Sequence, residues 1–413
     1  MPSPRQQLTR RQIYRRRRIA LFGGLAVVLA GLVFVVSAGA APLPAAAAAL
    51  SQPEPLTAAA AQPAWPGFGE TAIGAVGFDG VLASSGDQAA VPIASITKMV
   101  TSLVILEAKP LTVGEQGPNI TFTDADVDIY YDTIAEDGSS APVVAGMVLS
   151  EREALEAMLL PSANNYAVSL ANWAFGSEDA YLAAASAWIS EHKLTATTVV
   201  DTSGLSAGSM SSPADLVEIG KMVAANPVLA EIVAMTKADL PTIGVVTNTN
   251  KLLGDFGVDG IKTGTTDEAG ACLLFSADFT VGTETVTLVG VMLGGDTHSE
   301  LNEAIAALIQ SVKPGFQQLT LTEAGAPFAS YTSAWGQTSH AVAAEDRSVL
   351  VWSDTPITGT ATAKPVGTAR SGDSIGSVDF QVGSRTISVP LILDGTVSDP
   401  GLGWRLSHPG ELF

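Results

Sequence analysis

The chain has 413 residues, 47% of them hydrophobic and 15% charged, a composition that indicates two or three folded domains and excludes a disordered chain. Its formal net charge is −20, and because residues 1–18 hold seven arginines and no acid, the rest of the chain carries −27, which excludes nucleic-acid binding through phosphate contacts. Cys272 is the only cysteine, so an internal disulfide and a cysteine metal site are excluded, and we expect this thiol in the core.

The N-terminus has the pattern of a membrane-targeting segment. The basic residues 1–18 precede an uncharged, mostly apolar run over residues 19–41, which as a helix would span about 35 Å against a bilayer core of about 30 Å. Because arginines stay on the cytoplasmic side, we expect a transmembrane signal anchor at 19–41, in the cell membrane, with the remaining chain outside. The alternative is secretion after signal cleavage near Ala40, because Ala38-Gly39-Ala40 fits a small-x-small cleavage site.

Three further regions follow along the chain. Residues 42–66 are rich in Ala and Pro and predict a flexible or extended linker. Residues 67–315 show an early hairpin, then helical spacing, then late strands, which predicts an α/β fold of the α+β type, with helices packed on a mixed antiparallel sheet. Residues 316–413 show short strand patterns between turn residues and predict a small all-β domain.

Three short motifs carry the candidate chemistry. They are Ser95-Ile96-Thr97-Lys98 at the start of a helical pattern, Ser162-Ala163-Asn164 after Pro161, and Lys262-Thr263-Gly264 on an expected strand. Residues i and i+3 share one helix face, so the Lys98 amine can reach the Ser95 hydroxyl and take its proton if burial and a second cation lower its pKa. Taken singly, each motif also has a structural reading, as a helix N-cap for each serine and as an edge strand for Lys262.

The three motifs, in this order, are similar to the signature of penicillin-binding proteins and class A β-lactamases. Residues 68–312 resemble the low-molecular-weight penicillin-binding proteins that are serine-type D-alanyl-D-alanine carboxypeptidases. The stretches that carry this resemblance are 201–205, 212–216, 248–253 and 258–270, and residues 370–378 and 389–391 resemble the β domain appended in that family.

This resemblance implies a penicillin-binding, β-lactamase-like catalytic domain followed by the β domain. It implies removal of the terminal D-alanine from peptidoglycan stem pentapeptides, with β-lactam antibiotics as inhibitors, no cofactor, no metal and no nucleic-acid partner. Ser95 would be the nucleophile, Lys98 its base and Ser162 a proton relay to the departing amine. The substrate-binding residues would be Asn164 for the substrate amide and Lys98, then Lys262, Thr263, Gly264 and Thr265 around the carboxylate, with the Ser95 and Thr265 backbone N–H groups as the oxyanion hole.

One departure from the family and several alternatives stay open. Many family members have an arginine shortly after the strand that follows the third motif, where it helps to hold the substrate carboxylate, and residues 294–301 contain none. A class A β-lactamase would need a glutamate to activate water, for which Glu191 is the candidate. A non-catalytic cell-wall scaffold is the alternative from another class. The four histidines form no recognisable triad pattern and no metal-ligand spacing.

Overall fold

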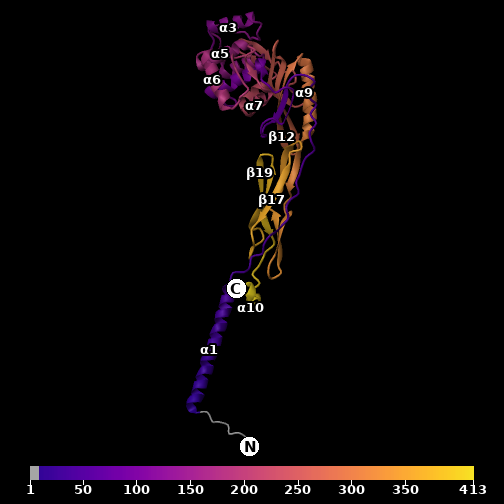
Figure 1. The fold of residues 1–413 in the computed structure, drawn as a ribbon. Helices are drawn as coiled ribbons and strands as arrows, with labels where there is room; N and C mark the ends of the chain where they lie inside the picture. The colour runs from indigo at the N-terminus through magenta and orange to yellow at the C-terminus, as the bar shows by residue number, and fades with distance from the viewer. Residues whose placement is uncertain (1–8) are drawn as a thin grey trace. The chain divides into compact units, whose positions relative to one another are not determined.

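The computed structural model describes residues 9–413, so the first eight residues of the basic segment, Arg5 among them, lie outside the described residues. The chain forms two units (Figure 1). One is continuous and consists of Ala59–Gln317. The other combines the N-terminal part up to Ala58 with Gln318–Phe413. Each unit is described by itself.

The continuous unit is built around a five-stranded antiparallel sheet with the strand order β10-β11-β12-β2-β3. The strands are β2 (Thr71–Ala75), β3 (Ala83–Ser85), β10 (Val258–Thr266), β11 (Gly270–Val281) and β12 (Glu284–Gly295). Helices cover both faces, so the middle of β11 and of β12 is buried on successive residues rather than on alternate ones. This explains the unbroken apolar runs of these two strands.

Eight helices of this unit pack on the sheet and on one another. They are α2 (Thr97–Ala108), α3 (Asp124–Ala135), α4 (Glu151–Leu159), α5 (Asn164–Phe175), α6 (Glu178–Glu191), α7 (Pro213–Ala225), α8 (Pro227–Ala234) and α9 (His298–Val312). Helix α7 lies against β2, β11 and β12, whereas α9 covers the other side of the sheet (Figure 1). Helix α2 packs against α4, α5, α6 and α7, and ten of its twelve residues are buried.

Short strand pairs and single-turn helices connect these elements. The strands are β4 (Val91–Pro92), β5 (Asn119–Thr121), β6 (Val148–Ser150), β7 (Met210–Ser211), β8 (Lys237–Leu240) and β9 (Gly244–Thr247), paired β4 with β7, β5 with β6 and β8 with β9. The 3₁₀ turns are η1 (Ala94–Ile96) and η2 (Lys313–Gly315). The expected α/β fold with an antiparallel sheet is therefore confirmed.

The second unit contains the all-β region and the N-terminal helix α1 (Arg10–Ala40). Its six-stranded sheet has the order β1-β14-β15-β19-β18-β17, and β13 pairs with β16. These elements are β1 (Ala49–Leu50), β13 (Phe316–Thr322), β14 (Pro327–Thr332), β15 (Thr338–Ala343), β16 (Arg347–Trp352), β17 (Ile357–Ala363), β18 (Ser374–Val382) and β19 (Arg385–Asp394), followed by α10 (Leu402–Ser407) and the turn η3 (Pro409–Glu411).

The Ala- and Pro-rich segment after α1 is extended and pairs with the β region. Strand β1 adds to the edge strand β14 with Ala49 opposite Ser330. Bridges from Ala46 to Val366 and from Leu56 to Ile357 continue this pairing. Residues 42–58 are therefore part of the β sheet's unit, whereas the rest of the expected linker begins the other unit.

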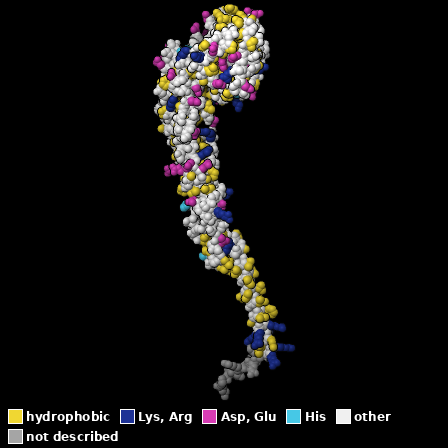
Figure 2. Space-filling view, turned by 180° about the vertical axis from the view of Figure 1, so that it is seen from behind, with side chains coloured by type: hydrophobic (Ala, Val, Ile, Leu, Met, Phe, Trp, Pro, Cys, Tyr) yellow, Lys and Arg dark blue, Asp and Glu magenta, His cyan; other side chains and the backbone are white. Residues whose placement is uncertain are grey.

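Helix α1 is the one element in residues 9–413 that is long and apolar enough to cross a membrane. Its apolar side chains are exposed along its length, and arginines gather at its N-terminal end (Figure 2). The C-terminal end of α1 is different, because Ala38 is completely buried there. Helix α10 packs on this end, and the Arg405 guanidinium donates hydrogen bonds to the carbonyls of Ala38 and Ala41.

Candidate active site

Ser95 and Lys98 lie together at the start of α2. Ser95 is in η1 and Lys98 is the second residue of α2, so the three-residue spacing puts both side chains on one face. Lys98 Nζ lies 2.8 Å from Ser95 Oγ. The preceding residue, Ala94, has φ of 47°, a left-handed conformation that costs a non-glycine residue energy and persists only where the surroundings enforce it.

Lys98 is completely buried and has two further polar neighbours. Its Nζ donates to Asn164 Oδ1 at 2.7 Å and to the Ser203 carbonyl at 3.0 Å. Burial, and next the nearby charge of Lys262, hold the pKa of Lys98 well below its usual value. The lowered pKa favours the neutral amine, which lies within hydrogen-bond distance of a hydroxyl.

The Ser203 carbonyl is held in place by a tight loop. Asp201 accepts hydrogen bonds from the Gly204 and Leu205 backbone N–H groups and from the Ser209 hydroxyl. Gly204 has φ of 79°, and a Cβ at this position would collide with the Ala94 carbonyl. The loop thus packs directly on the backbone that presents Ser95.

The second motif occupies the bend between α4 and α5. Ser162 is buried with φ of 66°, and among the residues that the structure describes its hydroxyl has no hydrogen-bond partner. Asn164 begins α5, and its backbone N–H donates to the Ser139 carbonyl at 2.7 Å. Asn164 thus joins the Ser95–Lys98 pair directly, whereas Ser162 lies two residues away along the chain.

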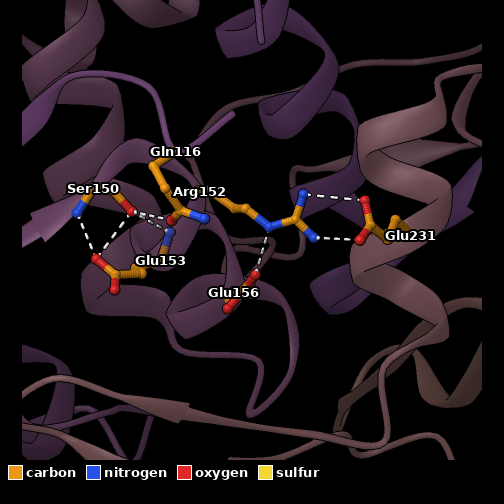
Figure 3. A network of polar contacts seen from close by, with 6 residues as sticks. All are labelled: Gln116, Ser150, Arg152, Glu153, Glu156 and Glu231. Carbon is orange, nitrogen blue, oxygen red and sulfur yellow. Dashed lines mark hydrogen bonds and ion pairs between the residues drawn. The ribbon is translucent and has the colours of Figure 1, made fainter. Parts of the chain in front are cut away.

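An ionic network around the buried Arg152 fixes helix α4, which leads into this bend (Figure 3). Arg152 Nε lies 2.9 Å from Glu156 on the same helix, and its two terminal nitrogens each lie 3.1 Å from a carboxylate oxygen of Glu231 on α8. At the start of α4, Ser150 and Glu153 form a capping box. The network joins α4 to α8, the helix that packs on β10, and so couples the second motif to the strand of the third.

The third motif lies on β10 beside the nucleophile. A Cβ placed on Gly264 would stand 3.1 Å from the Ala94 Cβ and from the Ile93 carbonyl, and 3.2 Å from the Ser95 nitrogen. Glycine at this position therefore lets the strand approach η1 closely. Lys262 is buried, and burial lowers its pKa to about 7.

The next two threonines on β10 each contact a residue to which sequence reasoning gave no role. Thr263 Oγ1 lies 2.6 Å from Thr249 Oγ1. Thr265 Oγ1 lies 2.7 Å from Nε2 of His298, the first residue of α9. Thr249 lies in residues 248–253, which carried part of the family resemblance, and His298 lies in residues 294–301, which lack the expected arginine. The sequence therefore already pointed to both regions.

The site combines a serine hydroxyl, a buried amine and a second lysine. Ser95, Lys98 and Asn164 form one hydrogen-bonded group, and Lys262 is near enough for its charge to act on Lys98. Among residues 9–413 no cluster of His, Cys, Asp or Glu could hold a metal ion. A hydroxyl beside a buried amine suits acyl transfer, in which the amine takes the hydroxyl proton as a new ester bond forms.

The fold and this Ser–Lys arrangement define a serine hydrolase of the penicillin-binding type. More particularly, the chain belongs to the D-alanyl-D-alanine carboxypeptidase family, whose model matches residues 78–297.

The chain is similar to curated members of this family. It is 28% identical to the D-alanyl-D-alanine carboxypeptidase DacA of Escherichia coli over 262 residues, which make up 62% of this chain and 64% of the relative. It is 30% identical to the D-alanyl-D-alanine endopeptidase of Pseudomonas aeruginosa over 217 residues, or 51% of this chain and 66% of the relative. The match thus spans slightly less than two thirds of the length of each of these relatives.

A solved structure supports the fold. The model is similar to penicillin binding protein 5 from Haemophilus influenzae with a TM-score of 0.57 and 20% sequence identity, covering 82% of this chain and 98% of that one. The similarity therefore includes more than the 220 residues that the family model matches.

Proposed function

We propose that this protein is a serine-type D-alanyl-D-alanine carboxypeptidase that removes the terminal D-alanine of peptidoglycan stem pentapeptides through an acyl-enzyme on Ser95. The observation that carries the proposal is the set of contacts around Lys98 Nζ. A neutral amine has two N–H donors and one lone pair. Its two donors match Asn164 Oδ1 and the Ser203 carbonyl, which leaves the lone pair for the Ser95 hydroxyl.

Acylation follows from this geometry. Neutral Lys98 takes the Ser95 proton while Oγ bonds to the carbonyl carbon of the penultimate D-alanine. The Ser95 and Thr265 backbone N–H groups stabilise the oxyanion. As the C–N bond breaks, the departing D-alanine amine receives a proton through Ser162, whose hydroxyl is not committed to another described residue. Water then hydrolyses the ester and restores Ser95.

Substrate binding is assigned to the strand and the second motif. Asn164 and Gly264 border the scissile bond, and Lys262 with Thr263 and Thr265 receives the terminal carboxylate. A β-lactam is an acylating analogue of the same dipeptide end, so penicillin is expected to form the same ester on Ser95. The proposal therefore includes sensitivity to β-lactam antibiotics.

Labelling and product release together test the nucleophile. The full-length protein in detergent is incubated with a fluorescent penicillin, and D-alanine release from a pentapeptide is measured in parallel. Ser95→Ala is expected to lose both signals. Ser102→Ala, which removes another serine hydroxyl of the same helix region, is the matched control and is expected to keep them. Undiminished labelling of Ser95→Ala would overturn the assignment.

The position of Glu191 argues against the β-lactamase alternative. Glu191 is the exposed last residue of α6 and borders a groove with Trp188 and with Glu107, near the C-terminal end of α2. Ser95 precedes the other end of α2, a helix about 18 Å long. We therefore expect a long-lived penicilloyl ester that Glu191→Gln does not change, as measured by intact mass over time. Rapid turnover in the wild type and a stable adduct only in the mutant would favour a β-lactamase.

The same protein is proposed to keep α1 as a membrane anchor, with the continuous unit Ala59–Gln317 and the β region outside the cytoplasm. Support comes from the contacts that α10 and Arg405 make with the C-terminal end of α1, where Ala38 is buried. Arg405 donates to the Ala38 and Ala41 carbonyls and pairs with Asp399 at 2.7 Å. Cleavage after Ala40 would remove the buried Ala38, one of the two residues whose carbonyls accept from Arg405. The measurement is the N-terminus and the cell fraction of the mature protein, and a soluble form that starts at Ala41 would contradict the anchor.

A further inference from the structure

The strand that carries the third motif meets helix α9 through one side-chain contact. Thr265 is exposed at the end of β10, and its hydroxyl lies 2.7 Å from His298 Nε2. His298 is half-buried and follows Thr297, whose side chain caps α9 by accepting from the Glu300 N–H. The cap fixes the start of the helix and with it the position of the imidazole beside Thr265.

The electrostatic surroundings of His298 are dominated by a cation. Burial, and next the charge of Lys262, lower its pKa. The titratable groups on the elements that meet here are Lys262 on β10, Asp267 and Glu268 in the turn after it, Asp296 and Glu300 around the start of α9, and Glu70 before β2. None of the carboxylates in this set is a cause of the shift, and so the free site keeps the imidazole neutral at pH 7.

We propose that His298 is a specificity-determining residue that, in its protonated form, binds the C-terminal carboxylate of the substrate together with Thr265 and Lys262. The inference rests on the proposed function, in which the terminal D-alanine is the leaving group, and it assigns recognition of that D-alanine's carboxylate to the His298 imidazole. In the empty site the side chains of His298 and Thr265 form a hydrogen bond with each other. An arriving carboxylate accepts from both and brings the negative charge that offsets Lys262.

This arrangement makes carboxylate recognition depend on pH. The bound anion raises the affinity of the imidazole for a proton, so binding is strongest below the pKa of His298 in the complex and weakens as pH rises through it. An arginine in this place would stay charged throughout. Lys262 cannot supply a constant charge either, because its own pKa is lowered to about 7.

A pair of substrates separates this effect from the titration of Lys98. Both are acyl-D-alanyl thioesters, one with mercaptoacetate as the leaving group and the other with the neutral mercaptoacetamide of nearly the same size. The selectivity is the ratio of the two kcat/KM values, measured from pH 5.5 to 8.5 on the full-length protein. Because Lys98 serves both substrates, its protonation cancels in the ratio.

We expect His298→Gln to lower the selectivity about tenfold at pH 6 and to leave it unchanged at pH 8.5. His298→Arg is expected to keep the wild-type selectivity at pH 6 and to exceed it at pH 8.5. Wild-type selectivity of His298→Gln at every pH would overturn the inference. Failure of the proposed function has another signature: the neutral thioester would then be hydrolysed equally by the wild type and by Ser95→Ala.

Discussion

Replacing Gly264 by alanine tests whether the close approach of β10 to the nucleophile sets the rate of acylation. The added Cβ would lie 3.1 to 3.2 Å from three atoms of residues 93–95. Ordinary carbon contacts need a further 0.3 to 0.5 Å or so, which the strand or η1 must supply by moving apart. If a misplacement of about 1 Å costs about 100-fold in rate, this shift predicts a loss of about 4- to 10-fold.

The assay is the second-order rate of acylation by a fluorescent penicillin, together with D-alanine release and the melting temperature. Gly264→Val, with two more methyl groups at the same point, is expected to lose far more. Gly67→Ala is the matched control, because nothing lies within 4 Å of a Cβ there. A folded Gly264→Ala protein that is acylated at the wild-type rate would show that the spacing between strand and nucleophile does not limit the reaction.

Three other changes test the base, the α4 network and a buried acid. Asn164→Asp places an anion beside Lys98 Nζ, which raises the pKa of the amine. The acid limb of the pH–acylation profile should therefore move up by about one pH unit. An unmoved limb would argue against Lys98 as the base. Arg152→Met leaves Glu156 buried without its partner and should cost about 3 kcal/mol of unfolding free energy. Glu231→Gln neutralises a carboxylate that is itself half exposed and should cost less than about 1 kcal/mol; equal costs in chemical denaturation would contradict this reading. Glu151 has no hydrogen-bond partner for either carboxylate oxygen among the described residues, and burial raises its pKa to about 7, so its charge destabilises the fold as pH rises from 4.5 through 7. Glu151→Gln should therefore raise the melting temperature by a few degrees at pH 8 and leave it unchanged at pH 4, and a gain at both values would refute the charge as the cause.

The sequence allowed the local parts of the site to be predicted. The spacing of Ser95 and Lys98 fixes their contact once a helix forms. The pairing of Lys98 with Asn164 followed from the family resemblance, and the structure brings the two side chains within 2.7 Å.

Contacts between residues that are far apart in the sequence could not be predicted. A backbone carbonyl such as that of Ser203 has no residue-type signature, because its position depends on how Asp201 folds the loop. The contact of Thr265 with His298 joins residues 33 positions apart through the packing of α9. The composition of residues 42–66 indicated a flexible or extended linker, but it could not show that β1 pairs with β14.

The discontinuous unit has a consequence for the order in which the protein matures. Ala49 leaves the ribosome early, yet its partner Ser330 is made only after all of Ala59–Gln317. The guanidinium that donates to the end of α1 comes later still, since Arg405 follows Ser330 by 75 residues. The continuous unit can therefore fold before the strands after Gln317 are made, whereas the sheet that includes β1 must wait for those strands. Until then residues 42–58 present an unpaired strand edge that is open to chaperones and proteases.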